Sequence, residues 1–207
     1  MAKLVLVRHG QSEWNAKGLW TGWTDVSLTD QGRQEAQHAG EALKEFHFDA
    51  SFTSNLKRAQ QTLEEIKNKL GGTIPTTITE ALNERNYGIY TAKNKWEVEQ
   101  EVGKARFLEI RRGWDVDIPE GESLKQVYER VIPYYQQNIL PLLEQGKNVL
   151  IAAHGNSLRA LIKYLENIPD SEIGNLELAT GEGYAYEIDA SGKVTDKQIY
   201  GHRENKA

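Results

Sequence analysis

The chain of 207 residues contains no cysteine. It therefore has no disulfide, no thiolate nucleophile, and no zinc or iron–sulfur site held by cysteine. Long apolar runs are missing as well. The apolar run near the N-terminus covers only residues 4–7, which is too short for a signal-peptide core or a membrane span. We therefore expect a cytoplasmic protein with no membrane partner.

A basic excess is also missing, since 25 Lys and Arg stand against 30 Asp and Glu, a formal net charge of −5. A broad nucleic-acid surface needs many cations to displace phosphate counterions, so nucleic acid is not an expected partner and any anion site must be local. Hydrophobic residues make up 39% of the chain, enough for a core. No internal repeat, low-complexity tract or flexible linker interrupts it. Residues 1–207 are therefore predicted to form a single domain.

Strand and helix patterns alternate along the chain. Short apolar, β-branched runs predict buried strands, and apolar residues at helical spacing predict amphipathic helices. The expected strands are residues 3–7, 50–53, 76–79, 149–153 and a closing hairpin of 184–188 with 194–199. The expected helices are residues 30–46 behind a Thr29 N-cap, 56–70, 96–114, 123–143 bent at Pro133, and 157–165. This order predicts an α/β fold, a three-layer sandwich with a mostly parallel central sheet flanked by helices.

Two of the predicted strands end in the same dipeptide. One apolar strand leads into His9 and Gly10, and another leads into His154 and Gly155. If both strands are parallel members of one sheet, the two imidazoles emerge at the same edge, where the glycines let backbone amides approach a ligand. A lone histidine after a strand is more often structural. The same context occurring twice predicts a site with two histidines.

Such a site could bind a metal or an oxyanion. For a metal, Glu84 or another carboxylate would be the third protein ligand. However, Arg8 is adjacent to His9, and Arg58 lies near the start of a predicted helix; fixed cations repel a divalent metal and attract an oxyanion. Histidine combined with guanidinium groups suits phosphoryl transfer, in which a neutral imidazole attacks and arginines hold the phosphoryl oxygens. That chemistry needs no metal.

Longer motifs surround these residues along most of the chain. They read Arg-His-Gly-Gln-Ser-Glu-Trp-Asn over residues 8–15, Thr-Gly-Trp over 21–23, Leu-Asn-Glu-Arg-Asn-Tyr-Gly over 82–88 and Ala-His-Gly-Asn-Ser-Leu-Arg over 153–159. Shorter blocks lie at residues 53–59, 94–95, 111–112 and 122–124. In content and order the set resembles the histidine phosphatase superfamily, and within it the cofactor-dependent phosphoglycerate mutases. The tripeptide at 8–10 alone would indicate only the superfamily.

The resemblance implies a glycolytic enzyme that interconverts 2- and 3-phosphoglycerate through a phosphohistidine, with 2,3-bisphosphoglycerate as primer and no metal. His9 would be the phosphorylated residue, and Glu84 the general acid or base for the substrate hydroxyl. Arg8, Arg58 and His154 would surround the transferring phosphoryl group. The implied substrate contacts are Asn15, Thr21, Gly22, Tyr87, Lys95, Arg111, Arg112, Gly155 and Asn156.

Several alternatives stay open at the level of single residues. Without its motif, Glu84 could be a solvated loop acid, and Arg111 with Arg112 could be an exposed helix face. Trp20 and Trp23 could stack on a ligand or anchor the loop beside them.

Alternatives also stay open for the whole chain. The same fold could serve a phosphatase for phosphoglycerates or sugar phosphates, in which water intercepts the phosphohistidine, or a silent module that binds phosphoesters. The segment over residues 115–122 is shorter than in longer mutases, which carry an additional loop there. Residues 200–207 are therefore expected to close the site in place of that loop. The sequence leaves open whether the protein is a monomer or a homo-oligomer.

Overall fold

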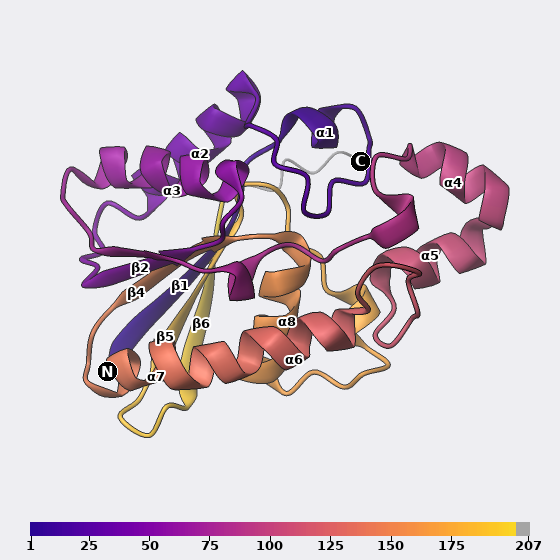
Figure 1. Cartoon of the computed structure of the whole chain (residues 1–207). Coiled ribbons are helices and arrows are strands. Elements are labelled where there is room, and N and C mark those ends of the chain that lie inside the picture. The colour runs from indigo at the N-terminus through magenta and orange to yellow at the C-terminus, as the bar shows by residue number, and fades with distance from the viewer. Residues whose placement is uncertain (202–207) are drawn as a thin grey trace.

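The protein is built around one sheet of six strands, as seen in a computed structural model that describes residues 1–201 (Figure 1). Its strands are β1 (Ala2–Arg8), β2 (Ala50–Thr53), β3 (Thr76–Ile78), β4 (Val149–Ala153), β5 (Gly183–Ile188) and β6 (Val194–Tyr200). They lie in the order β3-β2-β4-β1-β5-β6. The first four strands of that order are parallel, and β5 and β6 are antiparallel to their neighbours. The mostly parallel sheet and its closing hairpin are thus confirmed.

Helices connect the strands. The α-helices are α1 (Glu13–Ala16), α2 (Asp30–Ala42), α3 (Lys57–Leu70), α4 (Lys95–Val102), α5 (Lys104–Arg112), α6 (Leu124–Tyr134), α7 (Leu140–Glu144) and α8 (Gly155–Glu166). Short turns of helix are η1 (Glu80–Leu82), η2 (Gly88–Tyr90), the π-helical η3 (Tyr135–Ile139) and η4 (Ile173–Asn175). The expectation that residues 200–207 close the site falls mainly on residues 202–207, which lie outside the described part of the chain.

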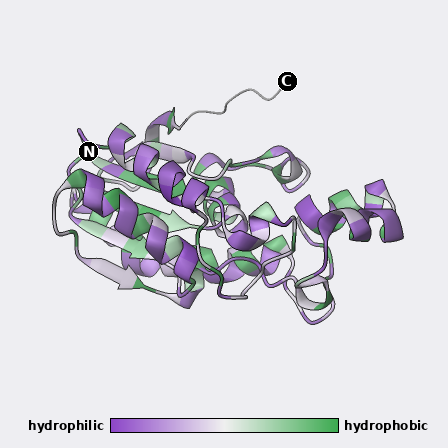
Figure 2. Ribbon diagram, turned by 90° about the horizontal axis from the view of Figure 1, so that it is seen from above, coloured by the Kyte–Doolittle hydropathy of each residue, from purple (hydrophilic) through white to green (hydrophobic). Residues whose placement is uncertain are grey.

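Helices cover both faces of the sheet, because successive side chains of a strand point to opposite faces. On one face, side chains of the central strands pack against α2 and α3 in a cluster that includes Val5, Val7, Leu150, Ala152, Ala39, Leu63 and Ile66. On the other face, the partners come from α6 and α8, in a cluster that includes Leu4, Leu6, Ile151, Val127, Val131, Leu158 and Leu161. Figure 2 shows the apolar strands beneath helices whose outer faces are mostly hydrophilic. The predicted three-layer sandwich is confirmed.

Two predicted helices end or break elsewhere than expected. The helix predicted over 30–46 ends at Ala42, although Leu43 stays buried in the core. The stretch predicted as one helix over 96–114 is two, α4 and α5, because Gly103 adopts a φ of 80° that a continuing helix does not allow. Both helices lie beyond the end of the sheet, to one side of the molecule in Figure 1.

The long helix predicted over 123–143 is continuous but irregular. Pro133 lies inside α6, and the chain widens directly after it into the π-helical turn η3 before α7 begins. Proline lacks the N–H that an α-helix needs at this position, and a π turn is one way to accommodate the loss. The helix predicted over 157–165 begins earlier, at Gly155, with His154 as its N-cap. That earlier start places the end of a strand and the start of a helix at the same histidine.

Candidate active site

The ends of β1 and β4 bring the two predicted histidines together. The two strands are parallel neighbours with Arg8 opposite Ala153, and the His9 backbone N–H donates to the Ala153 carbonyl at 2.9 Å. The rings of His9 and His154 lie edge to face with centroids 4.9 Å apart. Both residues are buried. The sequence prediction that the two imidazoles emerge at one edge of the sheet is therefore confirmed.

His9 is held as a neutral ring with one nitrogen free to attack. Its Nδ1 lies 2.7 Å from the Gly10 carbonyl oxygen, which can only accept, so Nδ1 carries the proton and Nε2 the lone pair. Burial, followed by the charges of Arg58 and Arg8, holds the pKa of His9 well below its usual range. Gly10 is needed here, since a Cβ on it would lie 2.1 Å from the Gly32 carbonyl oxygen.

His154 has the same tautomer but a different partner. Its Nε2 lies 2.7 Å from the Ser54 hydroxyl, which already accepts the Leu56 backbone N–H at 3.2 Å. Nε2 is the one acceptor recorded for the hydroxyl proton among the described residues, so we assign that proton to Nε2 and the ring proton of His154 to Nδ1. Nδ1 is buried and has no partner within the described chain. Burial, then Arg58 and His9, also lower the pKa of His154 well below its usual range, so this ring is a neutral donor.

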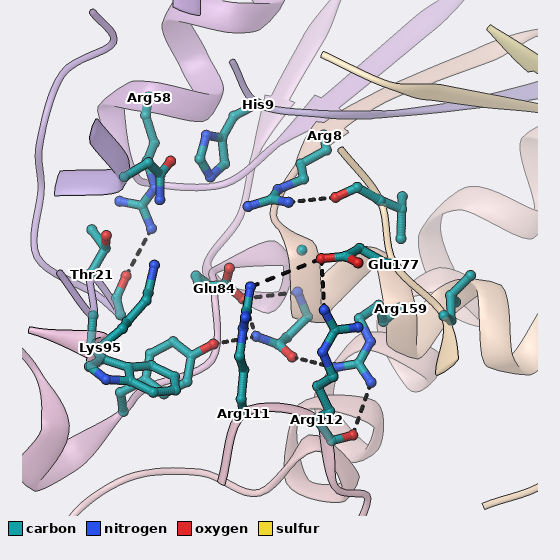
Figure 3. Close-up of a pocket in the computed structure, with 18 residues that line it drawn as sticks. Arg8, His9, Thr21, Arg58, Glu84, Lys95, Arg111, Arg112, Arg159 and Glu177 are labelled. Carbon is teal, nitrogen blue, oxygen red and sulfur yellow. Dashed lines mark hydrogen bonds and ion pairs between the residues drawn. The ribbon is translucent and has the colours of Figure 1, made fainter. Parts of the chain in front are cut away.

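The pocket beside these rings is strongly cationic (Figure 3). Six cationic side chains line it, namely Arg8, Arg58, Lys95, Arg111, Arg112 and Arg159. Arg58 is buried and donates to the carbonyls of Thr24 at 3.0 Å and Gly22 at 2.8 Å. Burial lowers the pKa of Arg58 to about 10, so it stays charged at neutral pH. Burial, then Arg111 and Arg8, lower the pKa of Lys95 to about 8.

Glu84 is a fixed part of the pocket wall. It is 8% exposed, and its Oε1 accepts the backbone N–H of Arg85 at 2.8 Å, the backbone N–H of Asn156 at 3.0 Å and the Asn156 side-chain amide at 3.1 Å. The same amide donates to the Tyr87 hydroxyl at 2.8 Å. Oε1 is thus occupied, and Oε2 is the oxygen available for proton transfer. The alternative of a solvated loop acid is wrong.

The structure gathers the other predicted site residues in the same place. The lining includes Asn15, Thr21, Gly22, Tyr87, Lys95, Arg111, Arg112, Gly155 and Asn156. His154 is the predicted residue that does not line the pocket and instead contacts His9 through its ring. Five lining residues were not predicted as site residues: Trp20, Arg159, Leu176, Glu177 and Leu178.

Three of these missed residues differ in how far the sequence could have indicated them. Arg159 lies three residues after Asn156 in a helix, the spacing at which two side chains share a face, and it donates to the Asn156 side-chain oxygen at 2.9 Å. Glu177 lies in an irregular segment between η4 and β5 and carries no local pattern. Trp20 is 1% exposed and contacts Tyr87, with ring centroids 4.5 Å apart.

Within residues 1–201, no group of three or more histidine, aspartate or glutamate side chains is placed to hold a metal ion. No helix of this described part is long and apolar enough to cross a membrane.

The fold and the pocket define an α/β protein that presents neutral histidines and clustered cations to an anion at the carboxyl ends of its parallel strands. The family model of the histidine phosphatase superfamily (branch 1) matches residues 4–198. The chain belongs to this superfamily.

Relatives of known name lie close in sequence. A 2,3-bisphosphoglycerate-dependent phosphoglycerate mutase from Cytophaga hutchinsonii is 53% identical over 91% of this chain and 88% of its own. A protein of the same name from Parvibaculum lavamentivorans is 47% identical over 97% of both chains. Among solved structures, the α-ribazole phosphatase from Shigella flexneri superimposes with a TM-score of 0.81 at 26% identity, covering 97% of this chain and 96% of that one.

Proposed function

We propose that this protein is a 2,3-bisphosphoglycerate-dependent phosphoglycerate mutase that interconverts 2- and 3-phosphoglycerate. The observation that carries the proposal is a second group of cations. Figure 3 shows His9, Arg58 and Arg8 along one side of the pocket and Arg111 and Arg112 across from them. A substrate with a phosphate at one end and a carboxylate at the other fits such a division, whereas a simple monoester has no need of the second group. The names of the relatives at about half identity agree with it.

The proposed reaction moves one phosphoryl group at a time through His9. The free hydroxyl of a monophosphoglycerate attacks the phosphorus held on Nε2; the P–N bond breaks, a P–O bond forms, and the hydroxyl proton passes to Glu84. Nε2 then attacks the other phosphate, whose P–O bond breaks as Glu84 returns the proton to the freed oxygen. Arg8, Arg58 and the Nδ1–H of His154 stabilise the charge on the phosphoryl oxygens in both directions.

The residues present fit an anionic primer. Buried polar atoms without a partner in the described chain include Arg8 Nε, Arg58 Nε, Thr21 Oγ1 and His154 Nδ1. Buried donors that lack a partner are costly unless a ligand satisfies them. Bound 2,3-bisphosphoglycerate supplies the first phosphoryl group to His9, and the proposed chemistry uses no metal.

The proposal extends to the setting of the enzyme. We treat residues 1–207 as a single domain, which the continuous sheet from β1 to β6 supports. We also place the enzyme in the cytoplasm, where phosphoglycerates of glycolysis and gluconeogenesis would be its small-molecule partners.

A coupled assay with and without trace 2,3-bisphosphoglycerate tests the proposal. We expect isomerisation of 3-phosphoglycerate that depends on the bisphosphate, persists in EDTA and is lost in His9→Ala. The variant removes the nucleophile, so incorporation of labelled phosphate into the protein should disappear with it. A metal requirement without dependence on the bisphosphate would contradict the proposal.

A phosphatase of the same superfamily is the second candidate. The end of the pocket around His9 is complete without Arg111 and Arg112, and the Shigella flexneri protein with the same fold is named a phosphatase. The ratio of inorganic phosphate released to isomer formed separates the two candidates. A mutase gives a ratio far below one, because the site passes the phosphoryl group to a sugar-acid hydroxyl before water reaches it.

A further inference from the structure

A carboxylate lies among the cations that the substrate is proposed to use. Glu177 Oε1 lies 2.7 Å from Arg112 Nη2 and 4.0 Å from Arg111 Nη2. Figure 3 marks both contacts with dashed lines. The segment that carries Glu177 is part of the pocket wall, since Leu176 and Leu178 on either side also line it. Glu177 belongs to none of the sequence motifs, and the proposed reaction does not use it.

Glu177 is charged at neutral pH. Its partial burial raises the pKa of its carboxyl, but Arg112 and Arg111 outweigh that effect and lower the pKa overall. The carboxylate therefore forms an ion pair with the arginines while the pocket holds no ligand. An anionic ligand group that binds the same arginines has to replace this pair.

The surroundings of Glu177 allow such an exchange. Its side chain is 54% exposed, whereas Glu84 is 8% exposed and held by three N–H donors. An ion pair whose carboxylate is half exposed contributes little free energy, so breaking the pair between Glu177 and Arg112 costs little. The backbone of Arg112 is anchored independently of Glu177, because the Arg159 guanidinium donates to the Arg112 backbone carbonyl at 3.0 Å.

We propose that Glu177 is a specificity-determining residue whose carboxylate occupies the position of the ligand's own anionic group on Arg111 and Arg112. Every ligand that reaches these arginines must displace it, so it weakens binding of such ligands and speeds their release. A ligand that carries only the phosphate near His9 is affected less. The proposal depends on the proposed function for the identity of the ligand, but the competition itself requires only an anion on the two arginines.

The charge of Glu177 can be removed with little change of shape. Glu177→Gln keeps the length and polarity of the side chain. Glu172→Gln, on an exposed residue five positions earlier that does not line the pocket, makes the same change in net charge. Calorimetry at fixed ionic strength compares two ligands that differ in a carboxylate, 3-phosphoglycerate and glycerol 3-phosphate. We expect Glu177→Gln to tighten 3-phosphoglycerate binding about three- to tenfold and glycerol 3-phosphate binding less than twofold.

The outcomes separate the proposal from its alternatives. Unchanged or weaker binding of 3-phosphoglycerate by Glu177→Gln overturns it, since the carboxylate would then orient the arginines rather than compete with the ligand. An equal gain in Glu172→Gln also overturns it, because the effect would be one of net charge. If Glu177→Gln shows the selective gain in binding but the wild-type protein has no isomerase activity, the proposed function is refuted and the proposed role of Glu177 still holds.

Discussion

His9 and His154 carry their protons on the same ring nitrogen yet offer opposite chemistry. In both rings Nδ1 holds the proton, set in His9 by the Gly10 carbonyl and in His154 by the Ser54 hydroxyl. His9 is anchored through Nδ1 and keeps the lone pair of Nε2 available. His154 is anchored through Nε2 and keeps the Nδ1–H available. One ring is therefore suited to attack phosphorus and the other to donate a hydrogen bond to a phosphoryl oxygen.

Ser54→Ala should impair catalysis, because the Ser54 hydroxyl no longer keeps the ring proton of His154 on Nδ1. Without the hydroxyl, the proton can move to Nε2, and the lone pair on Nδ1 would then face the phosphoryl oxygens. We expect kcat to fall about 100-fold, at the lower end of the range for one lost oxyanion donor, while KM changes little. Steady-state kinetics measure the loss, and ¹⁵N NMR of the His154 ring reports the tautomer.

Ser51→Ala is the matched control for Ser54→Ala. Ser51 is a buried serine on β2, three residues before Ser54, and its hydroxyl contacts Pro75 and Thr76 rather than a histidine. It should lower stability by about 1 kcal/mol and leave the His154 spectrum unchanged. Ser54→Ala with an unchanged tautomer would mean that the rest of the pocket sets the proton position.

At the scale of elements, helix α6 positions the segment that carries Glu84. Arg130 on this helix donates to the backbone carbonyls of Ala81 at 2.8 Å and of Asn83 and Glu84 at 3.0 Å. Its Nε and Nη2 also contact the Glu122 carboxylate at 2.8 and 3.0 Å. One guanidinium thus satisfies three carbonyls of an irregular segment that has no neighbouring strand to do so.

Arg130→Lys should therefore displace Glu84 although the charge is kept. An ammonium group cannot reach three carbonyls and a carboxylate in the fixed geometry of a guanidinium. We expect kcat to fall at least about tenfold and the free energy of unfolding to fall by about 2–4 kcal/mol, as lost hydrogen bonds to a charged group imply. Kinetics, thermal melting and faster hydrogen exchange over residues 81–86 measure these effects.

An exposed Arg to Lys change serves as the control for that experiment. Arg106 is paired with Glu109 at 3.0 Å, and both side chains are about half exposed. Arg106→Lys should leave kcat and stability nearly unchanged. If Arg130→Lys behaves in the same way, the backbone of residues 81–86 holds its shape without the guanidinium.

Elements with a strong local pattern could be predicted from the sequence, and those that depend on one backbone angle could not. The strands at 50–53 and 149–153 match their predicted bounds because each is a short buried run. The break at Gly103 could not be predicted, because its φ of 80° lies in a stretch with little apolar periodicity. The π turn after Pro133 was expected only as a bend, since the sequence does not say how a helix accommodates a proline.

The same distinction applies to the site. His9 and His154 could be predicted together because each follows an apolar strand with the same dipeptide, and the parallel register places them side by side. Glu177 could not, because its contact with Arg112 joins residues 65 positions apart in the chain, and neither has a pattern that points to the other. Arg130 was missed for the same reason, since its contacts to residues 81–84 arise from tertiary packing alone.

The whole molecule combines a net charge of −5 with a cationic pocket. Acidic residues outnumber basic ones over the whole chain. In the pocket the balance is reversed, because its described lining has six cationic side chains and two carboxylates. Because charges more than about 8–10 Å apart in solvent are screened at physiological salt, a ligand inside the pocket responds to the local cations rather than to the total charge. The net charge excluded only extended polyanions as partners.

The pH dependence of kcat/KM should follow the most easily deprotonated of these cations. Lys95 has a pKa of about 8, so it loses its charge, and with it an attraction for the anionic substrate, as the pH rises through 8. The pKa of His9 is well below its usual value of 6.5, so the ring stays neutral and nucleophilic as the pH passes through 6.5. We therefore expect kcat/KM to decline above about pH 8 and to show no loss caused by protonation of His9 near pH 6.5.

Lys95→Arg assigns the alkaline decline to its cause. A guanidinium stays charged throughout this range, so the decline of kcat/KM above pH 8 should disappear or move by more than one pH unit in the variant. The value at pH 7 is expected to fall only severalfold, because the charge is kept and only its position changes. Profiles recorded at constant ionic strength from pH 6 to 9.5 test this. An alkaline decline of equal midpoint in both proteins would show that a group other than Lys95 controls substrate capture, and that burial beside Arg111 and Arg8 has not brought this amine into the working range of the enzyme.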